Sequence, residues 1–178
     1  MDALKGRRLL IVAHPDDETL WAGGLVLRHP GDWTIVACSV PVADPLRAVK
    51  FHDAIERLGA KGWVVKQPDQ FGQPLALDAD LSGYDVVVTH GPEGDYGHPH
   101  HVQVHHHVRQ RARCRTVWFG YDEGETLRLT PEEGRQKLRA LQAYDHVLEY
   151  DGTPMPKWAA LLQRYGRQWL EREFYVDG

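Results

Sequence analysis

Residues 9–20 read LLIVAHPDDETL. The first five positions form a continuous apolar run of strand length, which is typical of a strand buried on both faces of a parallel sheet. His14, Asp16 and Asp17 follow this run directly, and a helical pattern begins at Glu18. In open parallel sheets, ligands bind beyond the carboxyl ends of the strands. The segment therefore predicts a strand–helix unit whose connecting loop carries ionisable side chains at a ligand site.

The same alternation of strand and helix patterns continues along the chain. Further strands are expected at residues 34–40, 62–65, 84–89 and 116–119. Helices are expected at residues 18–28, 45–58, 99–111, 131–144 and 158–174. This alternation predicts an α/β fold with a mostly parallel sheet of about five strands and helices on both of its faces. Because no internal repeat or linker composition interrupts the pattern, we expect one domain over residues 1–178.

The composition is that of an ordinary soluble globular protein. The 178 residues are 42% hydrophobic and 26% charged, with a net charge of −4, so no overall basic field is available to bind a nucleic acid. Cys38 and Cys114 are too few for a disulfide scaffold and form no CxxC pair, which predicts free thiols in a reducing compartment. No apolar stretch has the length of a signal peptide core or a membrane span. We expect a cytoplasmic protein, and its oligomeric state stays open.

A second ionisable segment follows the strand expected at 84–89. Residues 90–107 read HGPEGDYGHPHHVQVHHH. If Pro99 is the first helical residue, where its missing N–H costs nothing, His98 is the N-cap and His101 lies near the end of the first turn. Taken alone, this segment is equally well explained as a solvated, histidine-rich start of a helix.

The two segments together point to a metal site. Two imidazoles and one carboxylate are a common ligand set for a catalytic zinc ion that keeps one position open for water. The same set suits Fe²⁺, so the ligand types do not determine the metal. A second carboxylate beside the ligating one can act as a general base. A helix-capping aspartate would explain one of the three groups in the first loop, but not all of them.

Two motifs resemble a known family. AHPDDE at 13–18 and GHPHH at 97–101 are similar to the two signature motifs of the PIG-L/LmbE-type N-deacetylases. Weaker similarities extend to Arg47, to residues 137–144 and to residues 173–174. The resemblance implies a Rossmann-like α/β sandwich. It also implies hydrolysis of N-acetyl groups, usually on glucosamine-containing compounds, with a divalent metal that is most often zinc.

The resemblance also implies a role for individual residues. It assigns the metal to His14, Asp17 and His101. Asp16 matches the general base, and His98 matches the residue that stabilises the oxyanion or, in its charged form, protonates the leaving amine. Tyr96 stands where some members have a mobile tyrosine that contacts the carbonyl oxygen. Arg47 corresponds to an arginine that contacts the substrate.

The chain departs from the family pattern at two positions. His100 stands where the family usually has an aspartate that can orient a neighbouring imidazole. His100 is also a rival metal ligand, although on a helix it would point about 100° away from His101. Lys50 stands where a glutamate commonly follows the arginine at position 47. The loss of that carboxylate predicts a looser Arg47 or a contact with an acidic group of the substrate.

The expected function is therefore removal of an N-acetyl or other N-acyl group from a small amino-sugar-containing substrate. Two alternatives remain: a metal hydrolase of a different amide or ester, and a degenerate metal-binding scaffold. The adjacent Asp16 and Asp17 argue against a scaffold, which needs no base beside a metal ligand. Residues 44–47, 67–76 and 121–130 are expected to shape the pocket, but they do not identify the substrate.

Overall fold

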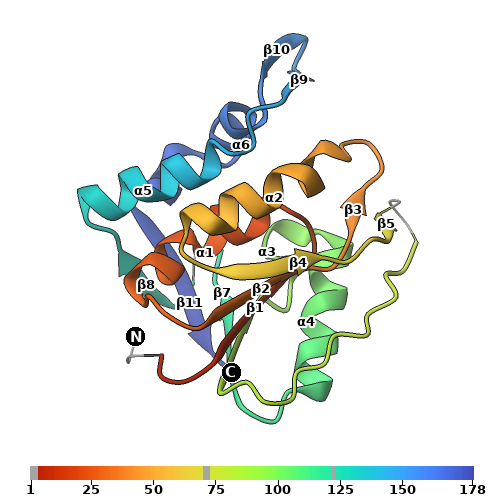
Figure 1. Ribbon diagram of the computed structural model, residues 1–178, viewed down its shortest axis with the longest axis vertical. Coiled ribbons are helices and arrows are strands. Elements are labelled where there is room, and N and C mark those ends of the chain that lie inside the picture. Colours follow the sequence, from red (N-terminus) through yellow and green to blue (C-terminus); the bar gives the residue numbers. More distant parts are fainter. Residues whose placement is uncertain (1–3, 70–72, 122) are drawn as a thin grey trace.

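The computed structural model describes residues 4–69, 73–121 and 123–178. Within these residues the chain forms a central seven-stranded sheet in the order β4-β2-β1-β6-β7-β11-β8 (Figure 1). The strands are β1 (Arg8–Val12), β2 (Trp33–Ala37), β4 (Lys61–Val64), β6 (Val86–Thr89), β7 (Arg115–Phe119), β8 (Glu125–Arg128) and β11 (Arg172–Asp177). The first five of these run parallel, while β11 is antiparallel to both β7 and β8.

Helices cover both faces of the sheet. They are α1 (Asp17–Arg28), α2 (Leu46–Arg57), α3 (Gly94–Gly97), α4 (Pro99–Arg111), α5 (Pro131–Leu141) and α6 (Lys157–Tyr165), with a short 3₁₀ helix at Arg167–Leu170. Helices α1, α2 and α5 pack on one face, and α4 packs on the other (Figure 1). None of the helices within the described ranges has the length and apolarity that a membrane span requires.

Two small strand pairs lie outside the central sheet. Strand β3 (Val40–Pro41) pairs in parallel with β5 (Pro68–Asp69). Strands β9 (Val147–Tyr150) and β10 (Thr153–Pro156) form an antiparallel hairpin beside α6 (Figure 1). Both pairs matter for function, because residues of β3, β5 and β9 line the cavity described below.

The apolar sequence of the central strand β1 follows from its burial on both faces of the sheet. Leu10 and Val12 belong to the core under α1, α2 and α5, whereas Leu9 and Ile11 belong to the core under α4. Side chains alternate between the two faces of a strand. A strand covered on both faces therefore needs an apolar residue at every position, and the continuous run at 9–13 was the correct indicator.

The predicted α/β fold with a mostly parallel sheet is confirmed, and the five predicted strands are the five parallel ones. The sheet has two further strands, β8 and β11. The helix predicted at 158–174 is wrong beyond Tyr165. The helix ends there because Gly166 adopts a φ of +93°, and residues 172–177 form β11, in which Glu173 and Tyr175 point to the buried side.

A buried charged group joins α1, α5 and β11. The carboxylate of Glu173 accepts hydrogen bonds from the backbone N–H groups of Gly24 and Leu25, at 2.7 and 2.9 Å, and forms an ion pair with Lys137. A Cβ atom at position 24 would lie 2.4 Å from a methyl carbon of Leu129, so a larger residue there would have to displace the Leu129 side chain. Three elements far apart in sequence are thus held together by one carboxylate.

We expect Lys137→Met to lower the free energy of unfolding by about 3–5 kcal/mol, because Glu173 is then left as an unpaired buried carboxylate. Urea denaturation at pH 7 measures this change. The double variant Lys137→Met/Glu173→Gln should recover part of the loss, since it removes the uncompensated charge. A single variant as stable as the wild type would contradict the expectation.

Candidate metal centre and active site

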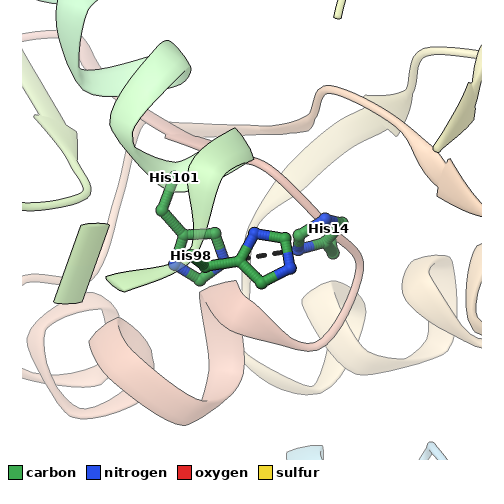
Figure 2. A group of neighbouring side chains, drawn as sticks. All are labelled: His14, His98 and His101. Carbon is green, nitrogen blue, oxygen red and sulfur yellow. Dashed lines mark hydrogen bonds between the residues drawn. The ribbon is translucent and has the colours of Figure 1, made fainter. Parts of the chain in front are cut away.

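Parallel pairing of β1 with β6 brings the two sequence motifs together. Both strands end at the same edge of the sheet, where His14 follows β1 and His101 lies in the first turn of α4. Asp17 is the first residue of α1. Figure 2 shows the rings of His14, His98 and His101 turned toward one another. Residues separated by more than 80 positions therefore share one buried site.

The three predicted metal ligands form a triangle. His14 Nδ1 lies 3.2 Å from Asp17 Oδ2 and 3.3 Å from His101 Nε2, and the last two atoms are 3.3 Å apart. Ligand atoms about 2.0–2.1 Å from a tetrahedral zinc ion lie about 3.3–3.4 Å from one another. The triangle therefore has the size of one face of a zinc coordination sphere, and all three residues are buried.

Each imidazole of the triangle contacts a carboxylate through the ring nitrogen that faces away from the triangle. His101 Nδ1 lies 2.8 Å from Asp95 Oδ2, and His14 Nε2 is in contact with Asp69 Oδ2. A carboxylate that accepts the outer N–H of a histidine sets the ring orientation and leaves the other nitrogen free for a metal. Both imidazoles are thus arranged as metal ligands usually are, with their inner nitrogens directed at the same point.

Asp95 also connects the two motifs through His90. The N–H of Ala13 donates to His90 Nε2 at 2.8 Å, so the ring hydrogen is on Nδ1, which lies 2.6 Å from Asp95 Oδ2. The His90 ring stacks on that of His101, and its burial lowers the pKa of His90, which favours the neutral form. No role was predicted for His90 or Asp95. Their position, at a strand end and beside the GHPHH motif, was the available signal.

The backbone turns Asp16 away from its neighbour Asp17. Asp16 adopts a φ of +102°, which is strained for a residue other than glycine. Its backbone N–H donates a hydrogen bond to Glu18 Oε2 at 2.9 Å. Glu18 is itself buried, which raises its pKa to about 7, and Tyr144 donates a hydrogen bond to it. Glu18 was not predicted as a site residue, but it holds the strained turn in place.

Two cations lie beside the Asp16 side chain. Asp16 Oδ2 is 3.3 Å from Arg47 Nη1 and 3.5 Å from Lys157 Nζ, yet it is buried and has no hydrogen-bond partner among the described residues. Asp44 Oδ2 accepts a hydrogen bond from Arg47 Nε at 3.0 Å. Sequence analysis missed Lys157, which comes from α6 at the far end of the chain. Asp44 supplies the carboxylate for Arg47 that was expected to be missing.

Lys50, the second departure from the family motifs, takes no part in the site. Its Nζ lies 2.6 Å from Asp145 Oδ1, on the partly exposed side of α2. Arg47 lines the cavity described below, whereas Lys50 does not.

A cavity of about 330 Å³ opens beside the triangle. It is lined by His14, Asp16, Asp17, Leu20, Pro41, Arg47, Asp69, Tyr96, His98, Leu148, Tyr150, Lys157, Ala160, Leu161, Arg164 and Tyr165. The predicted segments 44–47 and 67–76 contribute Arg47 and Asp69. No described residue of segment 121–130 lines the cavity, and residues 70–72 and 122 lie outside the described ranges. The remaining wall comes from β9 and α6, which the sequence did not indicate.

His98 and Tyr96 reach the cavity from the second motif. His98 is the N-cap of α4, as predicted, and its Nδ1 accepts a hydrogen bond from the His100 N–H at 3.3 Å. Burial, together with the charges of His101 and His14, lowers the pKa of His98 to about 3. The free protein therefore holds His98 neutral, whereas the predicted acid role needs its charged form. The ring of Tyr96 packs against that of Tyr165, with the two ring centroids 5.2 Å apart.

The pKa of His101 shifts in the opposite direction to that of His98. Burial alone would lower the pKa of His101, but the carboxylates of Asp17 and Asp95 raise it to about 9. The pKa of His14 is also raised, by Asp17 and Asp69 against the effect of burial. In the metal-free protein, protons therefore occupy positions from which a metal would have to displace them.

Comparisons with known proteins find similarity to deacetylases. No family model matches the chain. It is 30% identical to the 1D-myo-inositol 2-acetamido-2-deoxy-alpha-D-glucopyranoside deacetylase of Mycobacterium sp. (strain KMS), over 66% of this chain and 53% of the relative. The enzyme of the same name from Corynebacterium glutamicum (strain R) is 24% identical over 82% of this chain and 69% of the relative. The chain spans about half the length of the first of these relatives.

Solved structures give the fold. The N,N'-diacetylchitobiose deacetylase from Pyrococcus horikoshii matches 97% of this chain and 83% of its own with a TM-score of 0.67 and 14% identity. A deacetylase of teicoplanin biosynthesis matches 97% of this chain and 99% of its own, with a TM-score of 0.65 and 14% identity. The chain thus has the α/β fold of these deacetylases. Its resemblance to the PIG-L/LmbE-type N-deacetylases is confirmed.

We expect the zinc affinity of the protein to rise with pH, by about tenfold per pH unit for each proton displaced. Below pH 9 the ring of His101 carries a proton that zinc must displace. The competition between this proton and zinc for the ring of His101 weakens as the pH approaches 9, and it ends above pH 9. Titration against a competing chelator at pH 6, 7 and 8 measures the effect, and Asp95→Asn should flatten the dependence. Equal affinities at pH 6 and 8 would count against this protonation scheme.

Proposed function

We propose that the protein is a zinc-dependent N-deacetylase that hydrolyses an N-acetyl, or another N-acyl, group of a small amino-sugar-containing substrate. The triangle of His14, Asp17 and His101 carries the proposal, because it lies beside an unbonded carboxylate oxygen of Asp16 at the wall of a cavity. The activities of the related deacetylases support the substrate class. Fe²⁺ or another divalent ion would suit the same donors.

The ligand set gives the proposed reaction its chemistry. A zinc ion held by His14, Asp17 and His101 would polarise the acyl carbonyl and lower the pKa of a water in contact with it toward ~7. Asp16 is placed to take a proton from the attacking water as the water oxygen adds to the acyl carbon. The carbon–nitrogen bond breaks, and acetate and a free amine are the products.

The leaving amine and the oxyanion need separate partners. Because the pKa of His98 is lowered to about 3, we assign His98 as a neutral hydrogen-bond donor to the oxyanion, through Nε2. Its Nδ1 already accepts from the His100 N–H. Tyr96 is a second donor at the same wall. The amine receives the proton that Asp16 removed from water, so one carboxylate serves first as base and then as acid.

The cavity suits a small polar substrate. Its walls combine the cations Arg47 and Lys157 with Leu148, Tyr150 and Tyr165. A sugar presents hydroxyl groups to such cations and an apolar face to aromatic rings. Arg47, which Asp44 and Asp16 hold in place, is our proposed substrate contact. Cys38 and Cys114 are both free thiols, which supports the cytoplasm as the compartment.

Two other functions are kept as alternatives. A hydrolase of a different amide or ester would use the same groups and would release a different acid from a panel of substrates. A metal-binding scaffold would bind zinc and release no acid from any of them. The carboxylate of Asp16 at the cavity wall, beside the proposed ligand Asp17, favours an enzyme, because a scaffold needs no base beside a metal ligand.

Asp16→Asn should keep its zinc and lower the rate of acetate release by about 100-fold or more, the contribution typical of a general base. Asp17→Ala and His101→Ala should lose zinc. Metal analysis of the purified variants, together with acetate release from N-acetylglucosamine and its glycosides, measures both effects. Equal zinc contents in all three variants would refute the assignment of ligands and base.

His98→Gln and Tyr96→Phe should each lower kcat by about 100- to 1,000-fold, because each variant loses one donor to the oxyanion. Tyr165→Phe is the matched control. It removes the hydroxyl of the tyrosine that packs against Tyr96 but leaves Tyr96 itself in place, so a smaller loss is expected. The high-pH limb of the rate profile should keep its position in His98→Gln, since His98 is neutral throughout this range. A shift of this limb in His98→Gln would show instead that His98 acts as a charged acid toward the leaving amine.

A further inference from the structure

Asp69, the last residue of β5, lies between two imidazoles. Its Oδ2 contacts Nε2 of His14, and its Oδ1 lies 2.8 Å from Nδ1 of His100. The far nitrogen of His100, Nε2, lies 2.8 Å from the carbonyl oxygen of Gln73. A continuous chain of polar contacts thus runs from the backbone at Gln73 to the outer nitrogen of His14.

This chain of contacts is buried and anchored at both ends. His100 is 1% exposed, and the side chain of Asp69 is 9% exposed. The pairing of β3 with β5, in which Pro41 lies opposite Asp69, fixes the backbone of Asp69. His100 is held by the first turn of α4. Each carboxylate oxygen of Asp69 therefore lies next to one imidazole nitrogen, so contacts on both sides define the position of the carboxylate.

Adjacent residues of α4 serve different sides of the site. His101 directs Nε2 at Asp17 and His14, while His100 directs its ring at Asp69. This divergence follows from the rotation of about 100° per residue in an α-helix. His100 stands at the position where the family motif usually has a carboxylate. In this chain, a carboxylate reaches the imidazoles from β5 instead.

We propose that Asp69 is a positioning residue for the metal centre, and that His100 acts by holding Asp69. The contact of Asp69 Oδ2 with His14 Nε2 favours the tautomer of His14 that carries its hydrogen on Nε2, in which Nδ1 has a free lone pair directed at Asp17 and His101. This inference rests on the proposed function, because it requires a metal at His14.

Two other roles for the same residues predict different measurements. Asp69 lines the cavity, and a role in binding substrate would make Asp69→Asn change KM and leave the zinc affinity unaltered. His14, Asp69 and His100 also lie close enough together to hold a cation of their own. That role would give two zinc ions per chain in place of one.

The test is the dissociation constant and stoichiometry of zinc for the full-length protein, measured by chelator competition at one pH. Asp69→Asn should weaken zinc binding by about 10- to 100-fold, the usual effect of losing such a carboxylate. His100→Gln should weaken it less, and the double variant should bind no more weakly than Asp69→Asn alone, because the two residues act in series. His107→Gln is the matched control: His107 is another buried histidine of α4, contacting the carbonyl of Ala79, and its loss should leave zinc binding unchanged.

Four results would overturn the inference. The first is an unchanged zinc affinity in Asp69→Asn, with or without a raised KM. The second is two zinc ions in the wild type and one in His100→Gln. The third is additive losses in the double variant, which would mean that His100 does not act through Asp69. The fourth is a wild type that binds no zinc, which would also remove the proposed metal centre. If Asp69→Asn does not fold, His100→Gln, which leaves Asp69 in place, decides between the outcomes.

Discussion

The parallel pairing of β1 with β6 is the constraint on which the rest of the structure depends. Leu9 lies opposite Val87 and Leu10 opposite Val88, so the two strands end together and their polar loops meet. Both strands are apolar because helices cover both faces of the sheet. Ionisable residues can therefore gather only beyond the strand ends, and the hydrogen bond from Ala13 to His90 joins the loops at that edge. The site follows from the way the sheet is covered.

The site holds many ionisable groups in a small buried volume, and such burial is costly unless each group has a partner. Asp95 serves His90 and His101, and Asp69 serves His14 and His100. Asp95 adopts a φ of +64° and Asp16 is also strained. Strain and burial of this kind persist only where the surrounding structure determines the conformation. Metal binding would add stability by linkage, because the folded chain alone assembles the ligands.

The two ends of the chain contribute differently to the site. The groups proposed for chemistry come from the loops after β1 and β6, whereas much of the cavity wall comes from β9 and α6. Lys157 and Tyr165, both from α6, reach Asp16 and Tyr96 respectively. The last third of the chain thus completes a centre whose reactive groups are encoded in its first two thirds. Differences in this wall are the physical means by which proteins with the same centre would select different substrates.

The sequence by itself determined the five parallel strands, four of the helices and the identity of the proposed ligands. These follow from local periodicity and from motifs in which neighbouring residues act together. Tertiary structure alone decided that Lys157 belongs to the site, that Asp69 of the expected segment 67–76 contacts His14, and that residues 172–177 form a strand, because these features depend on partners distant in sequence. It also decided the neutral state of His98, since burial and the charges of His14 and His101 set that pKa. A motif specifies which groups are present; the packing around them sets their protonation and their neighbours.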